Sequence, residues 1–254
     1  MQLIDTHCHL DVAAFDRDRD AVLTRACTAG VTRIVVPGIT AAGWKKLLTL
    51  CTSETGLYPA LGLHPVFLDT HHPDDLQALE ASIARHKPVA IGEIGLDFYR
   101  PELDRARQKA LFEAQLHIAR AAGLPVLLHV RKAHDDTLAL LHKARVCGGI
   151  CHAFNGSLQQ ARQYIELGFK LGFGGMLTFD RSRKLHRLAR ELPLAIMVLE
   201  TDAPDMPPAS HHGQRNSPEY LPEVLQALAR LREEDTDTIA AQTTANAIEL
   251  LKLT

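Results

Sequence analysis

The chain is predicted to fold as a single (β/α)8 TIM barrel, an α/β fold, over residues 1–254. Apolar runs of strand length alternate eight times with amphipathic helical stretches, in units of roughly thirty residues. The apolar runs are nearly continuous, which is typical of parallel strands that are buried on both faces. A length of 254 residues is also typical of one such barrel.

The eight expected strands are rich in Val, Ile and Leu, and several of them end in a polar residue. No GxGxxG motif or P-loop follows the first strand, which removes the usual reason to prefer a doubly wound open sheet. The strands are expected at residues 3–10, 32–38, 57–65, 88–95, 124–130, 149–154, 169–174 and 194–202.

The expected helices follow from their end signals. Gly30 and Gly123 each come directly after a helical stretch, as C-terminal glycines do. Asp74 and Asp75 suit the first turn of a helix, and Pro218 suits a first helical position. The helices are expected at residues 17–29, 41–52, 73–86, 103–122, 133–144 and 157–167, within 181–192, from about 218, and at 235–251.

Composition restricts the cellular setting and the partners. A net charge of −2 predicts no general attraction to nucleic acid or to an anionic membrane, so a nucleic-acid contact would be local. Five cysteines without a CxxC pair argue against a disulfide framework and for a reducing compartment. With no signal peptide or transmembrane run expected, we predict a cytoplasmic protein. The oligomeric state stays open, and a monomer is compatible with the sequence.

Potential metal ligands stand at the predicted carboxyl ends of six strands. In an extended strand, His7 and His9 would point to the same face. Active sites of barrels lie where the carboxyl ends of the strands meet, and converging imidazoles and carboxylates without a metal would leave buried polar groups unsatisfied. The sequence therefore predicts a metal centre. The candidate residues are His7, His9, His64, Glu93, His129, His152 and Asp202.

Four histidines and two carboxylates exceed the needs of one tetrahedral ion, so two divalent ions are expected. The simplest partition puts His7, His9, Asp202 and Glu93 on one ion, and Glu93, His129 and His152 on the other. Ions bridged in this way lie about 3.5–4 Å apart and activate a shared water. Mixed nitrogen and oxygen ligands suit Zn, Mn, Co or Ni, and suit Mg less well.

The motifs that carry these residues resemble, in series, the TatD family of metal-dependent hydrolases with deoxyribonuclease activity, within the amidohydrolase superfamily. The resemblance runs from residue 4 to residue 218 and is strongest to the YjjV-type branch. It implies an amidohydrolase-like barrel, two divalent ions, phosphodiester hydrolysis and the same six metal ligands. The motifs are IDTHCHLD (residues 4–11), GLHP (62–65), GEIGLD (92–97), HVR (129–131), CHAFNGS (151–157), ETDAPDM (200–206) and RNSP (215–218).

The chain departs from the family pattern at two positions. Val130 stands where a small polar residue is common, and Asn155 stands where Ser or Thr is common. Both are expected to affect the substrate rim and neither is a ligand. Glu93 stands where many amidohydrolases use a carbamylated lysine as the bridge, which separates this chain from urease-like enzymes.

Three residues are expected to act on the substrate. Asp202 is the candidate to orient the water and to take its proton. His64 is a candidate proton donor or phosphate contact, with a purely structural role as the alternative. Arg131 is a candidate for a bidentate phosphate contact, with an ion pair to a helix carboxylate as the alternative.

Two further acids are expected to support the ligands. Glu200 shares strand parity with Asp202 and is a candidate to orient a ligand histidine, while an outward ion pair is the competing interpretation. Asp97 is either a similar support or a turn residue.

The predicted activity is that of a phosphodiesterase or deoxyribonuclease on 3′ ends or short single-stranded DNA. Its water is expected to be activated by the two metal ions. A nucleotide is a related candidate substrate. The alternatives are a metal-dependent hydrolase of a small ester, amide or lactone, and a metal-binding scaffold without catalysis. Cations near the metal ions would favour a phosphodiester, and Arg131 and Arg215 are the candidates.

Overall fold

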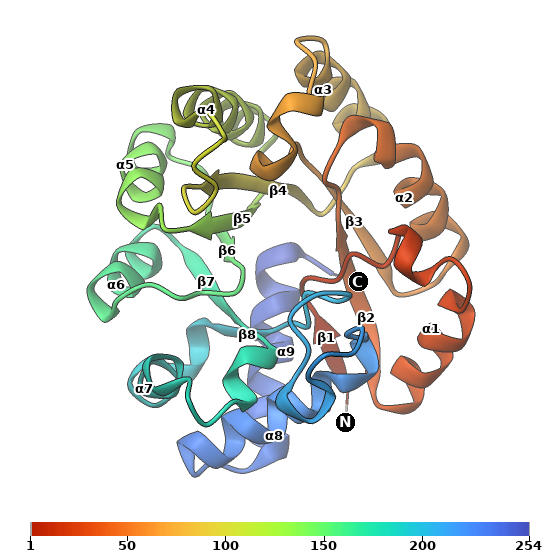
Figure 1. The fold of residues 1–254 in the computed structure, drawn as a ribbon, viewed down its shortest axis with the longest axis vertical. Helices are drawn as coiled ribbons and strands as arrows, with labels where there is room; N and C mark the ends of the chain where they lie inside the picture. Colours follow the sequence, from red (N-terminus) through yellow and green to blue (C-terminus); the bar gives the residue numbers. More distant parts are fainter. Residues whose placement is uncertain (1, 254) are drawn as a thin grey trace. The chain divides into compact units, whose positions relative to one another are not determined.

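The structure is a computed structural model that describes residues 2–253 (Figure 1). Its contacts cluster into two compact units, and each is described by itself. The first comprises residues 2–36, 153–158 and 171–253, and the second comprises residues 37–152 and 159–170. The prediction of one domain over residues 1–254 stays a prediction, and its two terminal residues lie outside the described range.

Four strands belong mainly to the first unit. β1 pairs in parallel with β2, and β7 pairs in parallel with β8. The main-chain N–H of Thr6 donates to the carbonyl oxygen of Leu199 at 3.0 Å, which joins the ends of β8 and β1. The order in this unit is therefore β7, β8, β1 and β2. The strands are β1 (Leu3–Asp5), β2 (Val31–Pro37), β7 (Phe169–Phe173) and β8 (Met197–Leu199).

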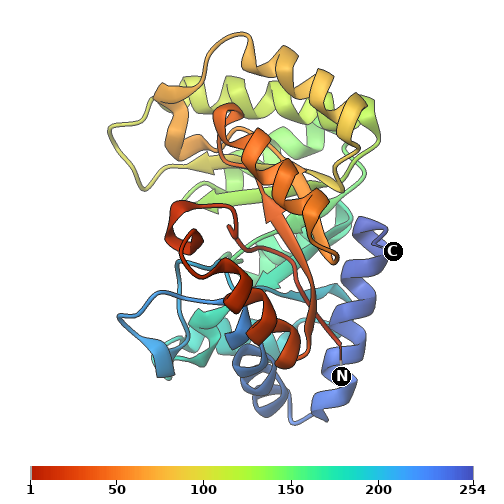
Figure 2. The same cartoon turned by 90° about the vertical axis from the view of Figure 1, so that its right-hand side faces the viewer.

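The helices of the first unit cover these strands. The last helix, α9, packs against β1 and β8, and it is the long blue helix of Figure 2. The Asp235 carboxylate accepts a hydrogen bond from the main-chain N–H of Thr238, which satisfies a donor at the start of α9. The helices are α1 (Arg19–Thr28), α7 (Arg183–Glu191), α8 (Leu221–Arg232) and α9 (Thr236–Leu251).

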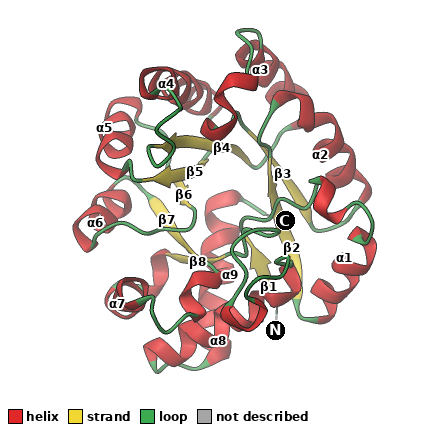
Figure 3. Cartoon of the chain, viewed as in Figure 1, coloured by secondary structure: helices red, strands yellow, loops and turns green. Residues whose placement is uncertain are grey.

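The second unit alternates strands with helices without interruption, as Figure 3 shows for β3 to α6. β3, β4, β5 and β6 pair in parallel with their sequence neighbours. Gly123 has a φ of 65° and ends α4, which confirms the predicted glycine stop. The elements are β3 (Leu57–Leu61), β4 (Ala90–Asp97), β5 (Val126–Arg131), β6 (Gly149–Cys151), α2 (Ala41–Ser53), α3 (Asp75–His86), α4 (Arg105–Ala122), α5 (His134–Ala144) and α6 (Leu158–Glu166).

The strand order confirms the predicted fold class. The eight strands follow one another as β1 to β8 in one sheet, the order of a (β/α)8 barrel. Four predicted strands end at least three residues earlier than expected: β1 ends at Asp5, β3 at Leu61, β6 at Cys151 and β8 at Leu199. The last residues predicted for these strands lie beyond the strands instead. No helix within residues 2–253 is long and apolar enough to cross a membrane.

Candidate functional site

His7, His9 and Asp202 form a compact set of donors in the first unit. The Nε2 atoms of both histidines lie 3.7 Å from the same carboxylate oxygen, Oδ1 of Asp202. The two rings are nearly perpendicular, at 82°, with centroids 5.0 Å apart. Ligand bonds of about 2.0–2.2 Å from one divalent ion would leave donors at such separations. The three residues therefore fit a metal ion.

The two histidines lie beyond the end of β1, which corrects the expectation that the strand itself presents them. Main-chain hydrogen bonds hold their loop instead. The N–H of His9 donates to the carbonyl of Ala203 at 2.8 Å, and the N–H of Asp202 donates to the carbonyl of His7 at 2.8 Å. The loops after β1 and β8 are thus bonded to each other beside the three donors.

Asp5 was not among the residues predicted for the site, yet it bonds to both loops that carry the three donors. Its buried carboxylate accepts hydrogen bonds from the main-chain N–H of His7 at 3.2 Å and of Thr201 at 3.0 Å, and from the Thr201 hydroxyl. Burial raises the pKa of Asp5 to about 7, although these hydrogen bonds oppose the rise. The only signal in the sequence was an acid at the end of an apolar run, two residues before His7.

In the second unit, one carboxylate oxygen faces three imidazoles. Oε1 of Glu93 lies 3.0 Å from Nδ1 of His129, 3.0 Å from Nε2 of His152 and 3.3 Å from Nε2 of His64. The Glu93 side chain is almost fully buried. A buried carboxylate surrounded by nitrogen donors is a chemically suitable ligand set for a divalent ion.

Asp97 holds His129 in position. Oδ2 of Asp97 lies 3.0 Å from Nε2 of His129, and Oδ1 accepts a hydrogen bond from the main-chain N–H of Tyr99 at 2.9 Å. Burial by itself would lower the pKa of His129, but its hydrogen bonds to Asp97 and Glu93 outweigh burial and raise it. A carboxylate on one ring nitrogen directs the other nitrogen outward, as is usual for metal-ligating histidines. Asp97 therefore contacts a candidate ligand histidine and also makes a turn contact, two roles that the sequence had left as alternatives.

The main chain determines the tautomer of His64. Its Nδ1 accepts a hydrogen bond from the N–H of Val66 at 3.1 Å, so the ring proton lies on Nε2. It is this Nε2 that faces Glu93. His64 therefore presents an N–H donor toward the cluster, which suits a proton donor or phosphate contact better than a metal ligand.

Two buried glutamines of α4 hold the ends of β3 and β4, and the sequence analysis missed them. The Gln115 amide bonds to both the N–H and the carbonyl of Leu63, at 2.7 and 3.1 Å. The Gln108 amide bonds in the same way to Asp97, at 2.8 and 3.0 Å. Polar residues on the buried face of an amphipathic helix were their only signal in the sequence.

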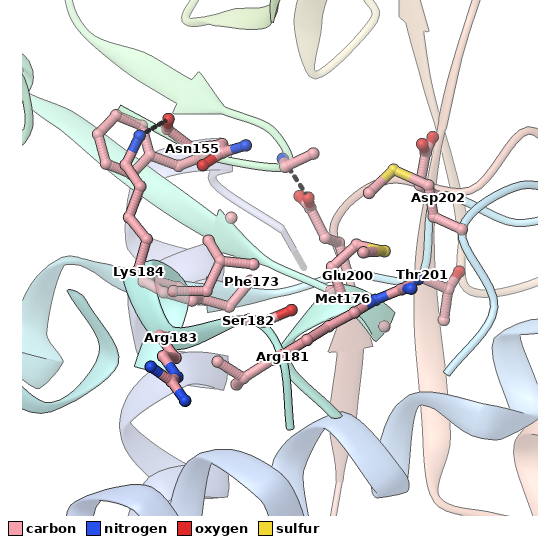
Figure 4. A pocket seen from close by; sticks show the side chains of 18 residues that line it. Asn155, Phe173, Met176, Arg181, Ser182, Arg183, Lys184, Glu200, Thr201 and Asp202 are labelled. Atoms are coloured by element: carbon pink, nitrogen blue, oxygen red, sulfur yellow. Dashed lines mark hydrogen bonds between the residues drawn. The ribbon is translucent and has the colours of Figure 1, made fainter. Parts of the chain in front are cut away.

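The alternatives for Glu200 and Arg131 are both wrong. Glu200 is fully buried, so it makes no outward ion pair, and its Oε1 accepts a hydrogen bond from the N–H of Ala153 (Figure 4). The Arg131 guanidinium stacks over the Tyr99 ring, 3.8 Å from its centroid, and within residues 2–253 no carboxylate lies at salt-bridge distance from it. The predicted ligand-orienting and phosphate roles stay predictions.

Arg215 does not supply the cation that the sequence analysis assigned to it. Its guanidinium forms a two-pronged ion pair with Asp18, at 2.8 and 2.7 Å, and donates to the carbonyl of Ala14 at 2.6 Å. The next residue, Asn216, donates from its side chain to the carbonyls of Thr201 and Asp205. The RNSP segment therefore fastens the loop after β8.

A cavity of about 250 Å³ lies beside Asp202 within the first unit (Figure 4). The loops after β6, β7 and β8 and the first turn of α7 form its walls. Arg181, which the sequence analysis did not consider, lines this cavity, and its guanidinium end points toward Thr201. The candidate ligand Asp202 thus borders a partly open cavity whose size suits a small molecule.

Comparisons with known proteins show the family to which this chain belongs. The family model described as TatD related DNase matches residues 4–252. The uncharacterized metal-dependent hydrolase YjjV of Escherichia coli strain K12 is 43% identical over 94% of this chain and 93% of its own length. The 3′-5′ ssDNA/RNA exonuclease TatD of Klebsiella pneumoniae strain 342 is 34% identical over 96% of this chain and 95% of its own length.

A solved structure supports the same assignment. The crystal structure of the TatD homologue YjjV from Escherichia coli K12 matches with a TM-score of 0.96 and 41% identity, and it covers 99% of this chain and 98% of that one. These relatives are enzymes by name, which removes the non-catalytic scaffold from consideration. The chain belongs to the TatD family and is a metal-dependent hydrolase.

Proposed function

We propose that the protein is a metal-dependent phosphodiesterase that acts on the ends of short single-stranded DNA. The observation that carries the proposal is the Glu93 carboxylate, which is buried and has one oxygen within 3.3 Å of three imidazoles. The exonuclease name of the relative at 34% identity supports a nucleic-acid substrate.

The proposed centre holds two divalent ions. His7, His9 and Asp202 would bind one ion, His129 and His152 would bind the other, and Glu93 would bridge them. Support comes from the group His7, His9 and Asp202 and from the Glu93 carboxylate between His129 and His152. The general rule that the strand ends of a barrel gather on one face supports it as well. The mixed nitrogen and oxygen donors suit Zn, Mn, Co or Ni better than Mg.

Bound divalent ions would polarise the phosphodiester and lower the pKa of water toward neutrality. The residues of the chain supply the remaining steps. Asp202 would orient the attacking water and accept its proton. The Nε2–H of His64, which faces Glu93, would donate to a phosphate oxygen or to the leaving oxygen. Asp97 keeps the ring of His129 in position.

The direct test is hydrolysis of short single-stranded DNA by protein reconstituted with Zn, Mn, Co, Ni or Mg, with EDTA-treated protein as the control. Carboxylic esters, amides and lactones are assayed beside it, because the same ligands would activate water for those substrates. Faster turnover of DNA than of the other substrates is expected. Hydrolysis confined to an ester, amide or lactone would overturn the phosphodiesterase proposal.

Substitutions at the centre provide the second test. Glu93→Ala and His152→Ala should abolish turnover while circular dichroism shows a retained fold, because each removes a donor that no neighbour can replace. His142→Ala, at an exposed position of α5, is the matched control and should keep full activity. Full activity in either centre variant would contradict the two-ion site.

A further inference from the structure

The cavity beside Asp202 has a predominantly apolar floor. Phe154, Phe173 and Leu177 line it and are at most 2% exposed. Met176 and Met206 line it from partly exposed positions. Thioethers and aromatic rings attract flat aromatic groups through polarisability and ring-edge contacts. The floor is therefore suited to an aromatic ring rather than to a hydrated polar group.

Basic side chains line one part of this cavity, and the carboxylates of Glu200 and Asp202 line another. Arg181 stacks on the Phe179 ring at 5.2 Å, and within residues 2–253 no carboxylate lies at salt-bridge distance from it. Lys184 lines the cavity as well, and its Nζ donates to the carbonyl of Asn155 at 2.6 Å. The positive charge of Arg181 is thus not neutralised by an acid of the chain. It favours an anionic group on whatever molecule enters.

The size of the cavity limits its occupant. About 250 Å³ lies below the roughly 300–1,000 Å³ of sites for drug-sized ligands. One ring system and its substituent fit such a space, and a run of several nucleotides does not. Asn155, where the chain departs from the TatD pattern, also lines this cavity.

We propose that this cavity receives the terminal base of the substrate strand and that Arg181 binds a phosphate of the same nucleotide. The inference rests on the proposed phosphodiesterase function, and it names the residues that select the substrate. Aromatic burial against Phe154, Phe173 and Met176 would hold the base beside Asp202. The guanidinium of Arg181 would supply the cation that Arg215 does not.

Binding of three probes to the metal-loaded protein tests the proposal by calorimetry: thymidine 5′-monophosphate, thymidine and inorganic phosphate. Arg181→Gln should weaken binding of the nucleotide about tenfold and leave thymidine unchanged. Met176→Trp should weaken both the nucleotide and thymidine and leave inorganic phosphate unchanged, because it fills the cavity. Arg187→Gln is the matched control, since its guanidinium pairs with Glu191 on α7 outside the cavity.

Hydrolysis of bis(4-nitrophenyl) phosphate and of 4-nitrophenyl butyrate, measured on the same variants, separates the two proposals. If the wild type cleaves the diester but neither variant changes nucleotide or thymidine binding, the base site is wrong and the phosphodiesterase function stands. If both variants weaken binding as expected while no diester is cleaved, the site stands and the function is wrong. A third outcome would assign the cavity to an acyl group instead. In that case Met176→Trp raises the KM for 4-nitrophenyl butyrate, and Arg181→Gln leaves nucleotide binding unchanged.

Discussion

His64 shows how one main-chain hydrogen bond can decide the role of a side chain. The N–H of Val66 occupies Nδ1, so Nε2 carries the ring proton and cannot offer a lone pair to a metal. By residue type alone, His64 is as good a ligand as His129 or His152. Its tautomer separates it from them.

We predict that His64→Ala lowers kcat by about 10²–10⁴-fold, the range for loss of a general acid or base, without loss of bound metal. The reason is that the ring donates a proton rather than binding an ion. Metal content by mass spectrometry of the purified protein, beside steady-state kinetics, checks both parts. Loss of about one ion per chain in His64→Ala would show that the histidine is a ligand after all; His129→Ala is the comparison that should lose metal.

Asp5 is a buried acid whose protonation couples to folding. Because burial raises its pKa to about 7, the folded protein binds more protons than the unfolded chain between about pH 4, the ordinary value for an aspartate, and about pH 7. Stability therefore falls as pH rises through this window. Below about pH 4, Asp5 is protonated in the folded protein, so the cost of burying a charged carboxylate is absent.

The prediction concerns EDTA-treated protein, in which no ion affects Asp5. Its free energy of unfolding in urea should fall by up to about 4 kcal/mol from pH 4 to pH 7 because of this one residue. Asp5→Asn should remove most of that dependence, because the amide carries no titrating proton. Parallel pH profiles for wild type and Asp5→Asn would contradict the raised pKa.

At the scale of elements, helix α4 positions parts of the centre that it does not itself contain. Gln115 and Gln108 each satisfy both polar groups of one peptide residue, at Leu63 before His64 and at Asp97 beside His129. Leu63 and Asp97 are buried, so water cannot replace the glutamines as hydrogen-bond partners of their main-chain N–H and carbonyl groups. The helix thus fixes the loop ends on which the two histidines depend.

Gln115→Leu is predicted to destabilise the protein by about 2–4 kcal/mol, since it leaves a buried N–H and a buried carbonyl of Leu63 without partners. Urea unfolding monitored by circular dichroism measures the change. Gln77→Leu, at an exposed position of α3, is the control and should stay within about 0.5 kcal/mol of wild type. An equally small effect of Gln115→Leu would show that the two hydrogen bonds from Gln115 to Leu63 do not stabilise the fold.

For the whole molecule, the donor residues come from positions 7 to 202 of the chain, so metal binding and folding are coupled. An ion that binds only the folded state at a hundred times its dissociation constant adds about 2.7 kcal/mol. For a chain of this size, that corresponds to roughly 5–10 °C in Tm.

EDTA should therefore lower the Tm by about that amount, and adding back Zn or Mn should restore it. Differential scanning fluorimetry with and without chelator measures the shift. The double variant His7→Ala/His129→Ala provides the control, because its Tm should not respond to EDTA. An unchanged wild-type Tm in EDTA would mean that the ions do not stabilise the fold.

The sequence by itself determined the fold class and the candidate ligands. Strand–helix alternation is a local pattern that can be read from the sequence. Polar residues at the ends of apolar runs also stand out, because a buried polar side chain needs a hydrogen-bond partner or a bound ion. His7, His9 and Asp202 lie together in the first unit, and Glu93, His129 and His152 lie together in the second. Both sets are made of the residues that the strand ends predicted.

Only the tertiary structure decided what surrounds these residues. Asp5 and Thr201 are hydrogen-bonded although 196 positions separate them, and Gln115 reaches Leu63 across 52. No local periodicity encodes such partners, because they depend on which loops and helices lie side by side after folding. For the same reason the sequence named Arg131 and Arg215 as candidate cations and did not single out Arg181. In the folded chain Arg215 is paired with Asp18, and Arg181 lines the cavity beside Asp202.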